Sequence, residues 1–299
     1  MGSGLRVRVY RGVGSCTPAS RPHGARRRMR GPGGIDMEPN QMLSGKVVIV
    51  TGAAGAIGKA IAMHLALDGA RVAVADLRVD AAEAVATDIR AAGGDAWATS
   101  VDVTKDDGPS MMVDAVVGHF GRLDAMIANA GILTINPILD MPVAEWDRTF
   151  SVNTRGVFLC FQAAARHLVK QDEGGRLIAT ASIAAKIGSP YQAHYQSSKS
   201  AILGLVRSAA WEFGPHGITV NCFCPGNVDT PMWDLIDRER GGRMGKAPGE
   251  LFKEVASRSP LGRTQVPGDI PPLVSFLVSD GSRAITGQSI NVDNGVVMF

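Results

Sequence analysis

The sequence predicts an α/β fold in which one parallel sheet is covered by helices on both faces. From residue 45 onward, short apolar runs such as VVIVT (47–51) alternate with longer alanine-rich stretches of helical periodicity. The apolar runs are nearly continuous, which is typical of strands buried on both faces of a parallel sheet. No linker or change of composition interrupts 45–299, so we expect a single domain there.

The expected elements follow in order along the chain, the strands as short β-branched runs and the helices as longer amphipathic stretches. We predict strands at 47–51, 71–76, 96–103, 123–131, 176–182, 218–226 and 289–293. We predict helices at 57–69, 80–94, 106–120, within 143–170, at 193–213 and at 268–279. The first helix ends at Gly69, a residue type that commonly follows a helix. The segment 228–266 has little strand character, and we expect it to act as a substrate lid.

The N-terminal 44 residues form a predicted leader with a different composition. Residues 1–30 contain eight arginines and no acid, and removing these charges from the net charge of +3 leaves −5 on the rest. The folded part is therefore mildly acidic, and we expect no nucleic acid to bind it. GPGG at 31–34 breaks any helix, so we expect the leader to be disordered. The alternatives are a transit peptide, a nucleic-acid-binding arm, or a later true start at Met29, Met37 or Met42.

Cysteine usage and hydropathy bound the class of protein. Cys16, Cys160, Cys222 and Cys224 show neither a disulfide framework nor the spacing of a zinc site. We predict no metal and reduced thiols in a cytoplasmic compartment, with Cys222 and Cys224 near the core. No apolar run reaches the ~18 residues that a membrane span needs.

A glycine-rich turn, TGAAGAIG (51–58), joins the first strand to the first helix. Gly52, Gly55 and Gly58 follow one another at intervals of three, which departs from the usual G-x-G-x-x-G spacing. Free amide groups at such a helix start favour a pyrophosphate. Asp76 ends the second strand, where a carboxylate accepts hydrogen bonds from ribose hydroxyls and repels a 2′-phosphate. The sequence therefore predicts NAD, although Arg78 leaves NADP open.

Residues 194–200 read HYQSSKS and place Tyr195 and Lys199 four apart. On a helix, this spacing brings both side chains to one face. A tyrosine beside a positive charge can act as a general base, because the charge favours the phenolate. The pair alone is a common surface pattern and decides nothing.

Together with further motifs in order, these features resemble the short-chain dehydrogenase/reductase family over 45–299. The motifs are TGAAGAIG, DV at 102–103, ANAG at 128–131, SVN at 151–153, Ser182, YQSSK at 195–199 and PGNVDTP at 225–231. The resemblance implies a single-domain, Rossmann-type, doubly wound sheet and an NAD-dependent oxidoreductase of secondary alcohols and ketones. It also implies a homotetramer, for which the alanine-rich helices 155–169 and 193–213 are candidate contact surfaces.

The resemblance assigns catalytic roles to four residues. Tyr195 is expected to be the general base and Lys199 to lower its pKa. Ser182 is expected to hydrogen-bond the substrate oxygen, and Asn153 to hold a water in a proton relay through Lys199.

The cofactor is expected to lie along the ends of the strands. Asp102 and Val103 would flank the adenine, Asn129 would stabilise the central strand, and Thr230 would contact the nicotinamide carboxamide. The expected cofactor contacts are Gly52, Gly55, Ala56, Ile57, Gly58, Asp76, Asp102, Val103, Asn129, Ala130, Gly131, Tyr195, Lys199, Pro225, Gly226, Val228 and Thr230.

The lid segment is similar to that of acetoin/2,3-butanediol and polyol dehydrogenases, through TPMWDLID, GKAPGELFKE and LGR. We expect substrate contacts from Ile183, Ile187, Gln192 and Trp233. Ile183 departs from the polar residue often found there in diol enzymes, which favours a more apolar pocket. The alternatives are a 3-oxoacyl-thioester reductase, which Asp76 argues against, and a non-catalytic NAD-binding or nucleic-acid-associated protein.

Overall fold

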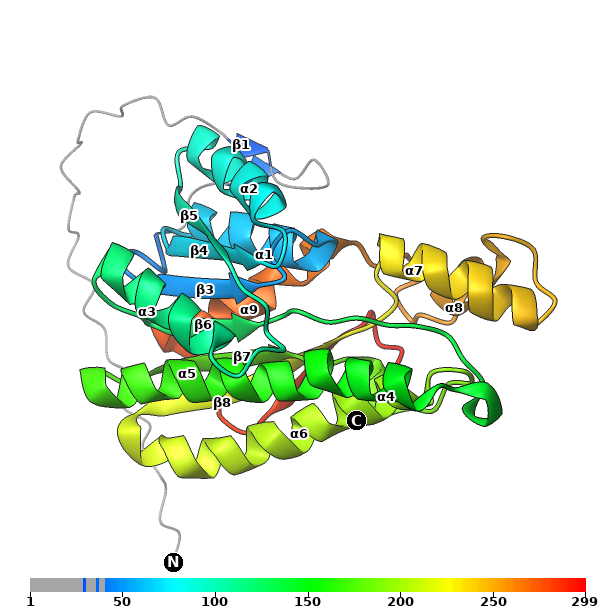
Figure 1. Cartoon of the computed structure of the whole chain (residues 1–299). Helices are drawn as coiled ribbons and strands as arrows, with labels where there is room; N and C mark the ends of the chain where they lie inside the picture. The colour runs from blue at the N-terminus through cyan, green and yellow to red at the C-terminus, as the bar shows by residue number, and fades with distance from the viewer. Residues whose placement is uncertain (1–28, 31–35, 38–40) are drawn as a thin grey trace, which may run out of the picture.

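The computed structural model describes residues 29–30, 36–37 and 41–299. Its centre is a seven-stranded parallel sheet in the order β5-β4-β3-β6-β7-β8-β9 (Figure 1). The strands are β3 (Val47–Thr51), β4 (Arg71–Asp76), β5 (Asp95–Ser100), β6 (Ala125–Ala128), β7 (Gly175–Thr180), β8 (Ile218–Pro225) and β9 (Ser289–Val292). The predicted doubly wound parallel sheet is confirmed.

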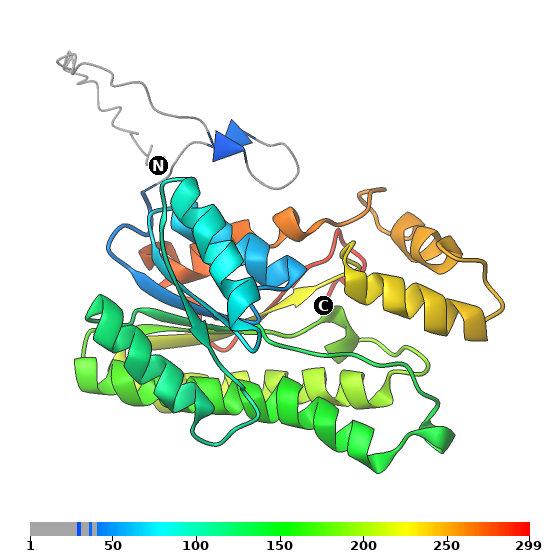
Figure 2. The same ribbon diagram turned by 45° about the horizontal axis from the view of Figure 1, so that its top comes forward.

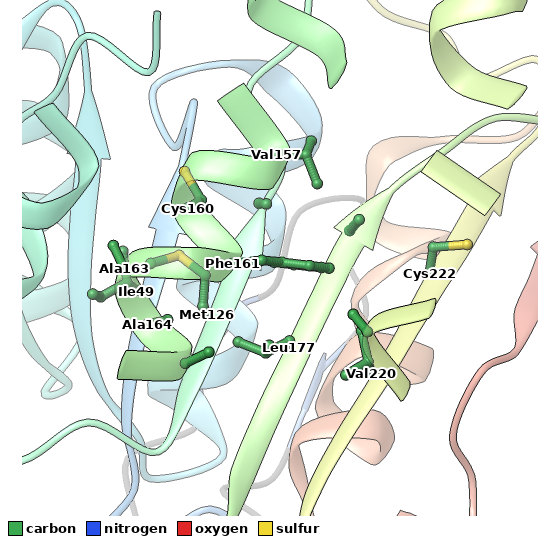
Figure 3. Packing of buried hydrophobic residues seen from close by; sticks show 14 of the residues in the cluster. Ile49, Met126, Val157, Cys160, Phe161, Ala163, Ala164, Leu177, Val220 and Cys222 are labelled. Atoms are coloured by element: carbon green, nitrogen blue, oxygen red, sulfur yellow. The ribbon is translucent and has the colours of Figure 1, made fainter. Parts of the chain in front are cut away.

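Helices cover both faces of this sheet (Figure 2). One face carries α3 (Gly108–Phe120), α5 (Gly156–Gln171) and α6 (Ala193–Phe213), and the other carries α1 (Ala56–Leu67), α2 (Val79–Ala91) and α9 (Pro271–Val278). On the first face, Phe161 and its neighbours on α5 pack against Met126 and Leu177 of the sheet (Figure 3). Successive residues of a strand point to opposite faces of the sheet. Ile49 therefore packs in the core beneath α3, α5 and α6, and Val48 packs in the core beneath α1, α2 and α9.

Two features differ from the sequence expectation. Leu43, assigned to the leader, is fully buried, and its amide donates to the Asp68 carbonyl at 2.9 Å, so the packed domain begins before residue 45. The long helix expected within 143–170 is divided into α4 (Val143–Phe150), a π-helical turn at Ser151–Arg155, and α5. The remaining leader expectations lie outside the described residues, apart from the antiparallel pair β1 (Met29–Arg30) and β2 (Asp36–Met37).

The predicted lid consists of two short helices beyond the carboxyl ends of the strands (Figures 1 and 2). They are α7 (Pro231–Ile236), which continues through a π-helical turn at Asp237–Gly241, and α8 (Glu250–Ser257). Asp237 joins them, because its carboxylate accepts hydrogen bonds from the amides of Gly249 and Phe252. None of the helices in the described ranges is long and apolar enough to cross a bilayer.

Candidate active site

A cleft of about 1190 Å³ lies where the strands end. The chain leaves β3 toward β4 on one side and later returns to β6 on the other, and such a switch point leaves a crevice at the carboxyl ends of the strands. Every residue predicted for the site lines this cleft, with the exception of Asn153. The described residues contain no cluster of side chains suited to a metal ion.

The glycine turn between β3 and α1 packs too closely against the rest of the fold to carry side chains. Gly52 has φ +64°, and a Cβ there would lie 2.9 Å from the Ala130 Cα. At Gly58, a Cβ would lie 2.8 Å from the side-chain nitrogen Nδ2 of Asn129. Helix α1 begins without a side-chain cap at Gly55, so its first amide groups are available to a phosphate.

Hydroxyl and amide side chains tie the ends of the central strands together. Thr51 Oγ1 accepts from the amides of Asn129 at 3.0 Å and Ala130 at 3.2 Å. Asn129 Nδ2 donates to the Thr51 carbonyl at 3.0 Å, and Thr180 Oγ1 donates to Asn129 Oδ1 at 3.0 Å. Asn129 thus ties together the carboxyl ends of β3, β6 and β7, where the resemblance implied a stabilising role for it. Thr51 and Thr180 were not anticipated, since a single threonine at a strand end carries no distinctive pattern.

Two carboxylates lie at the other end of the cleft. Asp76 accepts from the amides of Ala54 at 3.0 Å and Arg78 at 3.1 Å, one on each oxygen. Asp102 Oδ1 accepts from both the amide and the hydroxyl of Thr104, and these bonds hold the pKa of Asp102 below its usual value. Both side chains are therefore oriented as acceptors within reach of a nucleoside.

Helix α6 presents the Tyr195 and Lys199 side chains from one face. Lys199 Nζ lies 5.8 Å from the centroid of the Tyr195 ring and donates to the Thr180 carbonyl at 2.7 Å. Ser182 follows β7, and its hydroxyl accepts from the Ala184 amide at 3.1 Å, which fixes its position beside Tyr195. Both α6 side chains are buried in the cleft wall.

The pKa of Tyr195 differs from the expectation. Burial raises it above the ordinary value and outweighs the hydrogen bond with Ser182, which lowers it. Burial also lowers the pKa of Lys199 to about 8. The sequence analysis expected the lysine charge to dominate, but it could not anticipate how completely both groups are removed from water.

Asn153 occupies the π-helical turn behind the cleft wall and is fully buried. Its Oδ1 accepts from the Ile132 amide at 2.8 Å, while its Nδ2 donates to the Ile132 carbonyl at 2.9 Å and to Ser198 Oγ at 3.0 Å. These contacts use both ends of the side chain. Asn153 therefore fastens the loop after β6 to α6.

Comparison with known proteins agrees with this geometry. The family model described as enoyl-(acyl carrier protein) reductase matches residues 52–297. An L-2,3-butanediol dehydrogenase from Corynebacterium glutamicum is 41% identical, over 84% of this chain and 98% of that protein. An (S)-acetoin-forming diacetyl reductase from Staphylococcus epidermidis is 38% identical, with the same shares covered. The crystal structure of a short-chain type dehydrogenase/reductase from Mycobacterium marinum superposes with a TM-score of 0.79 at 37% identity, covering 87% of this chain and 98% of the other.

The chain belongs to the short-chain dehydrogenase/reductase family. The relatives in this comparison are oxidoreductases of alcohols and ketones, and the family uses nicotinamide cofactors.

The residues expected to contact the substrate all line the cleft. Ile183 and Gln192 are buried in its wall, and Ile187 is exposed. Trp233 on α7 packs against Phe252 of α8 with ring centroids 5.2 Å apart, so it joins the lid helices as well as lining the cleft. Tyr195 itself packs in a small cluster with Leu133, Ile135, Ile236 and Leu251.

A buried polar cluster behind the substrate wall was also missed. His194, fully buried beside the tyrosine, has its Nε2 2.7 Å from Thr134 Oγ1 and 3.5 Å from Glu145 Oε1. Asn136 Nδ2 donates to both oxygens of Glu145, at 2.8 and 2.7 Å. Burial lowers the pKa of His194, and Glu145 opposes this shift. The cluster joins the loop after β6 to α4 and α6, residues that are far apart in the chain.

Proposed function

We propose that the protein is an NAD(H)-dependent dehydrogenase that interconverts a secondary alcohol, a diol or polyol, and the corresponding ketone. The observation that carries the proposal is the arrangement of Tyr195, Lys199 and Ser182 in one cleft with a nucleotide-shaped glycine turn. The named relatives support the diol class, since two of them are a butanediol dehydrogenase and a diacetyl reductase.

In alcohol oxidation, Tyr195 accepts the hydroxyl proton while the carbon loses a hydride. The nicotinamide, when bound, supplies the hydride acceptor and a positive ring near the phenol. Ser182 orients the substrate oxygen toward the phenol. A charge on Lys199, whose Nζ lies 5.8 Å from the centroid of the Tyr195 ring, acts in favour of the phenolate. This contribution offsets part of the penalty that burial imposes on the ionised tyrosine.

Asp76 supports NAD as the cofactor. Its fixed carboxylate suits the two ribose hydroxyls of the adenosine and repels a phosphate at the 2′ position. Arg78 is the feature that favours some use of NADP, because its Nε lies 3.9 Å from Asp76 Oδ1 at the same position.

Replacing Tyr195 with phenylalanine tests the proposal. The variant should fold and bind NADH but lose nearly all turnover of diols and polyols. Tyr191→Phe is the matched control, because Tyr191 does not line the cleft, and it should keep the wild-type rate. Retained turnover in Tyr195→Phe would exclude the tyrosine as the base. Assaying diols, polyols and 3-oxoacyl thioesters with both cofactors ranks the substrate classes.

We also propose a homo-oligomer, a tetramer as the resemblance implies, in a cytoplasmic compartment. Phe158 on α5 is 44% exposed and Trp211 on α6 is 87% exposed, and an oligomer would cover such apolar groups. The described cysteines Cys160, Cys222 and Cys224 are free and buried, which suits a reducing compartment. Light scattering of wild-type protein and Trp211→Lys tests the assembly.

A further inference from the structure

A guanidinium without a protein partner lies at the substrate end of the cleft. Arg240, in the π-helical turn after α7, lines the cleft and is half buried. Its Nε is buried and finds no hydrogen-bond acceptor among the described residues, and no carboxylate there lies within ion-pair distance of it. A partly buried guanidinium whose Nε has no acceptor in the fold is favourable for an anion that enters the cleft.

The arginine belongs to the same helix face as the wall around the tyrosine. Ile236, four residues earlier, is buried and packs in the cluster that contains Tyr195 and Leu133. Both residues line the cleft, and Arg240 follows Ile236 in the π-helical turn that continues α7. The guanidinium is therefore positioned to meet a substrate at a point remote from the reacting carbon.

The charges around Arg240 do not neutralise it. Glu254 on α8 acts electrostatically on Arg240, but its carboxylate already pairs with Lys246 and Arg258. Burial lowers the pKa of Arg240; Glu254 opposes this shift and Arg258 adds to it. Asp237 is occupied by backbone amides of α8.

The acidic residues of the cleft lie away from the lid helices. Asp76 and Asp102 belong to the segments at the ends of β4 and β5, where Arg78 also lines the cleft, whereas the charged residues that α7, α8 and the turn between them contribute are Arg240 and Arg258. A wall whose charged groups are all basic attracts ligands of the opposite sign.

We propose that Arg240 binds an anionic group of the substrate, a carboxylate or a phosphate, at a point away from the carbon that exchanges hydride. The inference rests on the proposed dehydrogenase function and narrows its substrate class. A short uncharged diol has no group for this arginine, so the preferred substrate is an extended hydroxy or oxo compound that carries a negative charge. The planar fork of arginine suits carboxylate and phosphate equally.

The experiment compares charged probes with neutral counterparts. The carboxylate probes are unbranched methyl-ketone acids from levulinate upward in chain length, each beside its methyl ester, and the phosphate probe is acetoacetyl-CoA beside a short neutral thioester. Each is assayed for kcat/KM with wild-type protein, Arg240→Gln and Arg238→Gln. Arg238 is the matched control, because it lies two residues away and is exposed.

Wild-type protein should prefer one charged series, and Arg240→Gln should lower kcat/KM for that series by about tenfold to a hundredfold, as expected for loss of a charged hydrogen bond. The neutral probes and Arg238→Gln should change by less than about twofold. Preference for the acids identifies a carboxylate, and preference for the CoA thioester alone identifies a phosphate. Equal losses for charged and neutral probes, or no preference for charge in either series, would overturn the inference.

Binding separates this inference from the proposed function. Affinity for the same probes is measured by calorimetry with Tyr195→Phe in the presence of NADH, with and without Arg240→Gln. Charge-dependent binding without turnover by wild-type protein would retain the anion site and reject the dehydrogenase. Turnover of neutral ketones with no dependence on Arg240 would retain the dehydrogenase and reject the anion site.

Discussion

The carboxylate of Asp76 should decide between NAD and NADP, and Asp76→Asn tests this directly. A unit charge about 4 Å from another interacts with roughly 4 kcal/mol at an effective dielectric near 20. Removing the carboxylate charge therefore relieves repulsion of a 2′-phosphate by up to this amount, or roughly a thousandfold in binding. Solvent at the rim reduces the effect, so we expect the ratio of kcat/KM for NADP over NAD to rise between about tenfold and a thousandfold.

The geometry of Asp76 separates this effect from a loss of stability. Its two oxygens accept from the amides of Ala54 and Arg78, and asparagine keeps only one oxygen as an acceptor. The lost bond costs about 1 kcal/mol of folding stability but acts on both cofactors alike. The assay is steady-state turnover of one alcohol with each cofactor, and Asp102→Asn is the control, since it should lower both activities without changing their ratio. A fall in NAD activity with no gain for NADP would refute charge repulsion as the basis of selectivity.

Two other predictions follow from buried groups of the site. The pKa of Lys199 is about 8 in the folded protein and 10.5 ordinarily. Between pH 8 and 10.5 the unfolded chain therefore binds more protons than the folded protein. Lys199 thus makes the free energy of unfolding rise with pH through this window, by about 3 kcal/mol. Lys199→Met should therefore unfold at a higher urea concentration than wild type at pH 7, lose this pH dependence of stability and lose turnover. Lys59→Met, at an exposed side chain, is the control and should leave the dependence of stability on pH unchanged. An unaltered pH dependence of stability in Lys199→Met would contradict the lowered pKa of Lys199. His194→Gln should lower the melting temperature and kcat/KM together, because it loosens the wall beside Tyr195, and His167→Gln on α5 is the comparison; a wild-type kcat/KM in His194→Gln would show that the buried cluster does not position the tyrosine.

Features that depend on a short segment, such as a buried strand, could be predicted from the sequence. Contacts between segments that are far apart in the chain could not. VVIVT at 47–51 is apolar throughout because both of its faces are buried, so this strand was evident from composition alone. Nothing in SVNTR distinguishes a π-helical turn from the surrounding helix, and the break at Ser151–Arg155 was missed. The pairing of Glu145 with His194 joins two helices across 49 positions of the chain and leaves no periodic trace.

The same division applies within the catalytic group. Tyr195 and Lys199 could be recognised by their spacing on one helix, but their pKa values depend on burial by segments elsewhere in the chain. The wall around the tyrosine includes Ile236 of α7 and Leu251 of α8, which meet Tyr195 only in the assembled fold. Sequence reasoning therefore identified which atoms meet, while their protonation follows from the assembled fold.

That dependence links the lid to the chemistry of the tyrosine. Burial is the largest cause of the raised pKa of Tyr195, and two of the residues that bury it, Ile236 and Leu251, belong to α7 and α8. The packing of α7 and α8 around Tyr195 therefore favours the protonated phenol, which is the form that donates to a ketone in the proposed reaction. The proposed oxidation needs the phenolate, which Lys199 and the charge of an oxidised nicotinamide would stabilise. The proposed reduction would thus begin with the form of Tyr195 that the fold favours, whereas oxidation would depend on these two charges.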